Sequence, residues 1–256
     1  MRRLKDAIER AHFLSCELTE NRASLEVMTK VISFVNTKGG VGKSFLSVHM
    51  AVWLSDAGYR VAFLDADDQR TASKWLGDAE EHSVEVWVLE GTTEEKRTDE
   101  IRTLLNDLQS QSDFVVIDTK GSAGLTTSAA VVKSDLVCVP LQPSASDLWP
   151  IENSLTAIRL SQEVRGGEPK AFLVLNQTAD SDVLARDVRK LAKQFDMPMA
   201  RTSVKRLRAY RDAPGLRQFA TRLKDTRGHK AATRLGELFE EVLNGLLPAR
   251  REVANG

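Results

Sequence analysis

The sequence predicts an α/β protein with a doubly wound, mainly parallel sheet that is flanked by helices. Two observations predict this fold class. Short apolar runs rich in β-branched residues alternate along the chain with helix-length segments. Each run is nearly continuous in apolar residues, as expected for strands buried on both faces of a parallel sheet. The length of 256 residues suits one large domain of this kind.

Five segments are predicted to be buried strands, and a sixth is a weaker candidate. The five are residues 31–36, 61–65, 114–118, 136–141 and 172–176, and the weaker one is 84–89. The helices predicted between them are 43–57, 93–109, 123–133, 147–164 and 182–195. The last third of the chain, residues 204–247, is predicted to be mostly helical with one break at Pro214-Gly215.

Residues 28–247 are therefore predicted to form the main domain, with an extension on either side. Residues 1–27 contain a thin apolar stripe at helical spacing and are predicted to form an additional N-terminal helix. This helix has three open interpretations: packing or dimerisation, an overextended start site, or a partner-binding arm. Residues 248–256 are predicted to be a disordered tail.

The composition argues against several classes of protein. Apolar and charged fractions are ordinary, the net charge is zero, and no apolar run is long enough for a transmembrane helix. The charged N-terminus is unlike a signal peptide. The two cysteines, Cys16 and Cys138, are far apart and indicate neither a disulfide framework nor a metal site. We therefore expect a cytoplasmic protein.

A glycine-rich turn between the first predicted strand and helix is typical of a phosphate-binding loop. Glycines let backbone N–H groups converge on phosphate oxygens, and the helix N-terminus that follows adds a favourable dipole. Lys43 supplies a positive charge, and Ser44 is placed to ligate Mg²⁺. The usual first glycine is replaced by Thr37, while Lys38 is a second lysine in the loop. The residues predicted to bind ATP here are Lys38, Gly39, Gly40, Val41, Gly42, Lys43, Ser44 and Phe45.

The K-G-G-V-G-K-S sequence at residues 38–44 is the deviant Walker A motif, and the chain resembles the ParA/MinD family of P-loop ATPases over roughly residues 28–245. The V-P-L-Q-P-S-A-S-D-L-W stretch at 139–149 is similar to the smaller, plasmid-type ParA proteins. The resemblance implies that Lys38 reaches the phosphates of a partner subunit, so that an ATP-bound homodimer forms. Lys38 and Lys43 are therefore catalytic candidates.

Carboxylates follow two of the predicted strands. Carboxylates at these positions beside the P-loop can hold Mg²⁺ or orient an attacking water. The family pattern D-x-D-P-Q implies that Asp67 positions the lytic water, with Asp65 nearer the metal. Asp118 ends a buried strand in the Walker B arrangement and would hold Mg²⁺.

Two residues depart from the family pattern beside these carboxylates. Asp68 replaces a proline, which adds negative charge, and we expect it to loosen the turn. Lys120 lies close to the expected γ-phosphate position. It either contacts phosphate or points to solvent, and we favour solvent. These departures leave a non-hydrolysing ATP switch or scaffold as a third class of function.

Two further regions are assigned to ligands. The resemblance places Asn176 against adenine, with Pro198 in the loop that flanks the base; the alternative is an asparagine that only caps the next turn.

Residues 201–234 are strongly basic. The family uses this region for sequence-independent DNA binding, in which phosphate contacts dominate. The DNA-binding candidates are Arg206, Arg208, Arg211 and Arg217. Their alternative role is a solvated face or support of a dimer.

The sequence thus predicts a partner-stimulated ATPase with ATP and Mg²⁺ as cofactors. Its homodimer would bind non-specific DNA, associate with the nucleoid, and drive plasmid or chromosome partition with a centromere-binding, ParB-like adaptor. One alternative is the same ATPase positioning a protein cargo. A MinD-like regulator on a membrane is disfavoured, because the C-terminus lacks an amphipathic basic helix.

Overall fold

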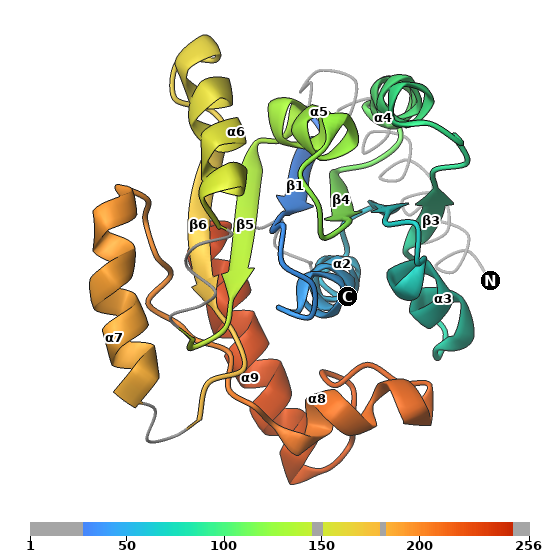
Figure 1. The fold of residues 1–256 in the computed structure, drawn as a ribbon. Helices are drawn as coiled ribbons and strands as arrows, with labels where there is room; N and C mark the ends of the chain where they lie inside the picture. The colour runs from blue at the N-terminus through green and yellow to red at the C-terminus, as the bar shows by residue number, and fades with distance from the viewer. Residues whose placement is uncertain (1–27, 145–150, 180–182, 248–256) are drawn as a thin grey trace, which may run out of the picture.

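The computed structural model describes residues 28–144, 151–179 and 183–247. A six-stranded, fully parallel sheet has the order β3-β2-β4-β1-β5-β6 and is flanked by helices (Figure 1). This confirms the predicted fold class. The predictions for residues 1–27 and 248–256, and for the end of the 139–149 stretch, lie outside the described residues.

Each predicted strand is present, within two residues of its expected bounds. The strands are β1 (Lys30–Phe34), β2 (Val61–Ala66), β3 (Glu85–Val88), β4 (Phe114–Thr119), β5 (Leu136–Leu141) and β6 (Lys170–Leu175). β2, β4 and β5 are buried along their whole length, since helices cover both faces of the sheet. The weaker candidate is β3, which lies at one edge of the sheet and is the shortest strand.

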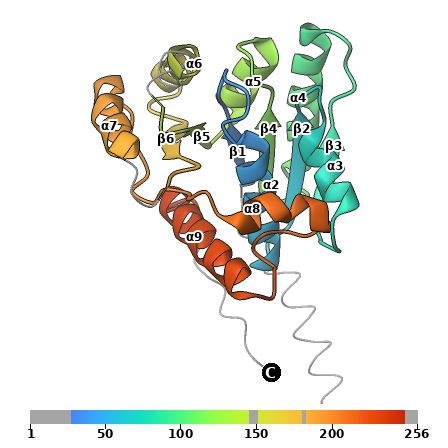
Figure 2. The ribbon, with the colours of Figure 1, turned by 60° about the horizontal axis from the view of Figure 1, so that its bottom comes forward.

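The helices divide between the two faces. They are α2 (Lys43–Asp56), α3 (Thr71–Asp78), α4 (Glu94–Leu108), α5 (Leu125–Lys133), α6 (Ile151–Val164), α7 (Val183–Ala192), α8 (Arg208–Asp212) and α9 (Thr226–Val242), with short 3₁₀ turns η2 (Lys193–Phe195) and η3 (Pro214–Leu216). α2, α3 and α9 share one apolar core with the sheet, while α4 to α7 cover its other face. Figure 2 shows α8 and α9 on the face that α2 also covers. No helix in the described ranges is long and apolar enough to cross a membrane.

One helix was missing from the predicted secondary structure. α3 was not expected, because residues 71–78 are too polar and too few to give a clear periodic signal. The last third is mostly helical, as predicted, because α8, η3 and α9 cover more than half of residues 204–247, while much of the basic segment before α9 is loop.

The chain also adds an unpredicted segment along the free edge of β6. Leu173 N–H donates to the carbonyl of Pro198 at 2.8 Å, and Ala200 N–H donates to the carbonyl of Leu173 at 2.9 Å. Further along, Val204 N–H donates to the carbonyl of Leu175 at 2.9 Å. These bonds satisfy the backbone groups at the edge of β6. They also place the basic residues that follow at the carboxyl end of the sheet.

Candidate nucleotide-binding site

The phosphate loop lies between β1 and α2, at the carboxyl end of the central strand. Asn36 anchors its start: its Nδ2 donates to the carbonyl of Pro140 at 2.7 Å, and its Oδ1 accepts from Lys38 N–H at 2.9 Å. α2 begins at Lys43, directly after Gly42, so its free N–H groups face the loop. The strand, loop and helix therefore have the arrangement that the sequence predicted.

Lys43 is the buried cation of this loop. Its residue is only 6% exposed, and its Nζ donates to the carbonyl of Lys38 at 3.2 Å. Burial lowers the pKa of Lys43, while the charges of Asp118 and Asp67 raise it. Both carboxylates are therefore close enough to act on Lys43. The predicted catalytic and metal-binding residues lie in one cluster.

Gly42 explains why the loop needs glycine at that position. Its φ of +98° lies in the left-handed region, and a Cβ there would lie 2.1 Å from Nδ2 of Asn176. Asn176 is 2% exposed, and its Nδ2 donates to the carbonyl of Val41 at 2.8 Å. Its Oδ1 accepts from Gln177 N–H at 2.9 Å. Each end of the amide thus makes one hydrogen bond within the protein and keeps the capacity for a second, so the amide supports the turn and can also pair with a base.

Two glutamines also brace the loop, and the sequence analysis did not identify them. Nε2 of Gln142 donates to the carbonyl of Gly40 at 2.8 Å, and Nε2 of Gln177 donates to the same carbonyl at 3.2 Å. They come from the ends of β5 and β6, respectively. The only sequence signal was their position directly after predicted strands.

The predicted metal ligands meet at the carboxyl ends of β2 and β4. Asp65 and Asp118 are paired in register on these neighbouring strands. Asp65 already accepts from two backbone groups, Asp67 N–H at 3.0 Å and Ser73 N–H at 2.8 Å. Asp118 is fully buried, and neither of its carboxylate oxygens has a hydrogen-bond partner among the described residues.

The environment of Asp118 fits a cation. Burial raises its pKa to about 7, the nearby Ser44 side chain opposes that shift, and the charge of Asp65 adds to it. A buried carboxylate with two unpartnered oxygens is a suitable Mg²⁺ ligand. The described residues contain no group of three or more His, Cys, Asp or Glu side chains that could hold a metal.

Asp67 lies just beyond this cluster on the loop after β2. It is partly exposed, and its Oδ1 accepts from Gln69 N–H at 2.9 Å. Asp68 is paired with Arg97 and, at 3.8 Å, with Lys120. The turn is therefore held by ion pairs, whereas the sequence analysis expected Asp68 to loosen it. Lys120 is also paired with Glu94, and its side chain is 23% exposed, so the expectation that it points to solvent was wrong.

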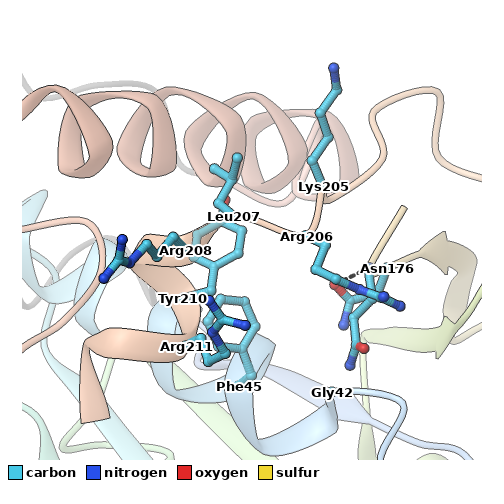
Figure 3. Close-up of a pocket in the computed structure, with 10 residues that line it drawn as sticks. Gly42, Phe45, Asn176, Lys205, Arg206, Leu207, Arg208, Tyr210 and Arg211 are labelled. Carbon is cyan, nitrogen blue, oxygen red and sulfur yellow. Dashed lines mark hydrogen bonds between the residues drawn. The ribbon is translucent and has the colours of Figure 1, made fainter. Parts of the chain in front are cut away.

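A cavity of about 460 Å³ opens beside the phosphate loop (Figure 3). Phe45 and Tyr210 form its aromatic wall, with ring centroids 4.8 Å apart. The lining is Gly42, Phe45, Asn176, Gln177, Lys205, Arg206, Leu207, Arg208, Tyr210 and Arg211. An aromatic and aliphatic wall next to a phosphate loop is suited to hold the base of a nucleotide.

A buried histidine supports this wall from beneath. His49 is fully buried one helical turn after Phe45, and its Nε2 accepts from Ala220 N–H at 3.0 Å. Its Nδ1 therefore carries the proton and donates to the carbonyl of Phe45 at 2.8 Å. Burial lowers the pKa of His49 to about 4, so the ring is neutral near pH 7.

The predicted DNA-binding arginines are all exposed, but they do not lie together. Arg206, Arg208 and Arg211 line the cavity, whereas Arg217 follows η3, where its carbonyl accepts from Glu80 N–H at 2.8 Å. Other basic residues of the segment are structural. Arg222, for example, is paired with Asp56 at 2.5 Å.

The structure does not bring Pro198 to the cavity. Pro198 lies on the segment beside β6 and is absent from the residues that line the cavity. The aromatic wall of the cavity comes from α2 and α8, which are far apart in the sequence.

A family model described as the CobQ/CobB/MinD/ParA nucleotide-binding domain matches residues 32–248. The chain belongs to this family. Among its relatives, maintenance of carboxysome distribution protein A of Halothiobacillus neapolitanus is 31% identical over 218 residues, which cover 83% of this chain and 95% of the relative. Protein ParA of Rhizobium radiobacter is 30% identical over 133 residues, which cover 52% of this chain and 58% of that protein.

Solved structures of the family agree with the fold. The ATP complex of a McdA variant from Cyanothece has a TM-score of 0.70 at 14% identity and covers 88% of this chain and 99% of its own. The chain is a ParA/MinD-type P-loop ATPase. When bound, Mg²⁺ would neutralise charge at the phosphates, and Ser44, Asp65 and Asp118 are the residues that would hold it.

Proposed function

We propose that this ATPase positions a cargo inside the cell by a cycle of nucleotide-dependent dimerisation and DNA binding. ATP would close a homodimer in which Lys38 reaches the partner's phosphates. The dimer would bind nucleoid DNA without sequence preference, and a partner protein would stimulate hydrolysis and release it. The predicted residue roles are part of this proposal: Lys38 and Lys43 neutralise phosphate charge, and Asp67 orients the attacking water.

The arrangement of the exposed arginines supports the DNA-binding step. Arg206, Arg208 and Arg211 surround the cavity that opens beside Gly42, so a bound nucleotide would lie among them (Figure 3). Exposed arginines without fixed base-reading geometry suit phosphate contacts, which give sequence-blind and salt-sensitive affinity. Of the three, Arg208 is partly neutralised by Asp212 at 3.1 Å.

The nature of the cargo has two candidates. A relative named for carboxysome distribution matches 83% of this chain and 95% of its own length, which favours a large protein assembly as cargo. A plasmid or chromosome held by a ParB-like adaptor is the other candidate, supported by a shorter match to a ParA protein. Purified candidate adaptors distinguish them: the physiological adaptor should raise the rate of phosphate release in the presence of ATP and DNA.

The deciding experiment measures binding to random-sequence duplex DNA at moderate salt with ATP, ADP or no nucleotide. We expect tight binding with ATP alone, and loss of that binding in Lys38→Ala. At saturating ATP, the double variant Arg206→Ala/Arg208→Ala should bind DNA more weakly, with a shallower salt dependence. Lys96→Ala/Arg102→Ala on α4 is the control, because it removes the same charge far from the cavity. Equal or absent DNA binding in all three nucleotide states would refute the DNA-binding cycle.

A further inference from the structure

Four charged side chains beside the nucleotide site join three segments of the chain. Asp68 follows β2, Glu94 and Arg97 belong to α4, and Lys120 follows β4. Asp68 pairs with Arg97 and with Lys120, and Lys120 pairs in turn with Glu94. Two positive and two negative charges therefore form one neutral network. Asp68 and Lys120 are the same two residues that depart from the family's sequence pattern.

Arg97 holds the acidic loop on both sides of Asp67. Its residue is 9% exposed, its Nη1 donates to the Asp68 carboxylate, and its Nη2 donates to the carbonyl of Ala66 at 2.9 Å. Ala66 and Asp68 are the residues that flank Asp67 in the chain. A planar guanidinium with two fixed contacts restrains the backbone between them.

Lys120 connects this restrained loop to the phosphate loop. The next residue is Gly121, where an added Cβ would lie 3.4 Å from both the backbone N of Gly39 and Nζ of Lys43. Glu94 fixes the other side of Lys120, because its Oε2 also accepts from Thr126 N–H at 3.0 Å and from the Thr126 hydroxyl at 2.7 Å. These contacts hold the pKa of Glu94 at about 2, so it stays charged at neutral pH.

We propose that Arg97, Asp68 and Lys120 are positioning residues for ATP hydrolysis. They hold Asp67 at a fixed place relative to Gly121 and the phosphate loop, and so set the geometry of the attacking water. The inference rests on the role proposed above for Asp67. None of the three residues lines the cavity beside the phosphate loop. Their effect therefore falls on the rate of the chemical step rather than on ATP affinity.

Arg97→Lys tests the restraint while keeping the charge. A single ammonium cannot make both guanidinium contacts in the same geometry. We expect kcat to fall between about 10- and 100-fold while ATP affinity changes by less than about twofold. The control is Arg102→Lys on the same helix, because Arg102 is exposed and has only a 3.4 Å ion pair with Asp99. It should leave both quantities unchanged.

Asp68→Asn provides a second variant that does not disturb a buried side chain, since the Asp68 side chain is 54% exposed. Asp99→Asn is its control, and thermal unfolding checks the fold of each variant. A lower kcat with unchanged ATP affinity in Arg97→Lys and Asp68→Asn supports the proposal. A normal kcat in both, or an equal loss of ATP affinity, overturns it.

Asp67→Asn separates this proposal from the role on which it rests. Loss of hydrolysis in Asp67→Asn, together with normal kcat in Arg97→Lys and Asp68→Asn, would leave Asp67 as the water-positioning residue and reject the restraint. Normal hydrolysis in Asp67→Asn would remove the role of Asp67 itself. In that case any effect of the other two variants would need a different cause, and the positioning proposal would fail with it.

Discussion

The two ends of the nucleotide site are built in different ways. The phosphate end comes from one short stretch of chain, in which Asn36 anchors the loop and Lys43 is buried at the start of α2. The base end comes from segments far apart in the sequence, with Phe45 from α2 packed against Tyr210 from α8. Its rim consists of exposed arginines, whereas the phosphate end has buried charges.

A sequence motif can reveal a phosphate-binding loop more readily than a base-binding wall. Phosphate binding needs backbone N–H groups and a fixed loop shape, so glycines and lysines at fixed spacing are sufficient to recognise it. A base-binding wall needs only apolar surfaces that meet, and many residue types can provide them.

The largest expected effect is at the phosphate end. Lys43→Ala should reduce the rate of ATP hydrolysis by about 100-fold or more, because it removes the buried cation of the phosphate loop. Phosphate release under saturating ATP is the measurement. Lys133→Ala, at the end of α5 and exposed, serves as control. A Lys43→Ala variant with near-normal turnover would contradict the placement of the phosphates.

The next effect concerns the support beneath the base end. The folded protein lowers the pKa of His49 from 6.5 to about 4, so the unfolded chain binds more protons between these pH values. The contribution of neutral His49 to the free energy of unfolding is complete above pH 6.5. This contribution falls by about 3 kcal/mol in total as the pH decreases toward 4. Chemical unfolding at several pH values measures this.

His49→Gln is the comparison that isolates this contribution. Asp118 acts in the opposite direction, because its pKa is raised to about 7 in the folded protein and its contribution weakens as pH rises. Both proteins contain Asp118, so the difference between them reports His49. The stability of His49→Gln should depend less on pH between 4 and 6.5. The same slope in both proteins would show that the ring is not held neutral.

Gly42→Ala tests the joint between the two ends. The left-handed φ alone costs about 1–3 kcal/mol, and the new methyl would displace Asn176. We expect lower stability together with weaker ATP binding. Gly58→Ala is a matched control, since its φ of +89° imposes the same strain in open space. Equal effects of the two substitutions on ATP binding would show that the contact between Gly42 and Asn176 is unimportant.

The smallest effect is expected at the base end. Tyr210→Ala should weaken ATP binding by about tenfold, which corresponds to the loss of one aromatic stacking partner. Tyr210→Phe keeps the ring and should bind ATP normally. Binding of a fluorescent ATP analogue measures both variants. Unchanged affinity in Tyr210→Ala would place the base outside this cavity.

Some of the site was predictable because it depends on local sequence. Strand β4 ends with Asp118 and strand β2 with the acidic turn, and parallel strands bring their carboxyl ends to one edge. The role of Asn176 was less accessible. An asparagine after a strand suits both base pairing and turn support, and only the folded positions of Val41 and Gln177 reveal its turn-supporting hydrogen bonds.

The sequence alone determined the parallel sheet, the phosphate loop and the carboxylates that face it, because apolar runs and glycine spacing encode local geometry directly. It also established that Asp68 and Lys120 depart from the family's pattern. The tertiary structure alone decided that these two residues join Arg97 and Glu94 in one network. It also decided which arginines surround the cavity, because ion pairs and pocket walls depend on side chains that meet only after the chain has folded.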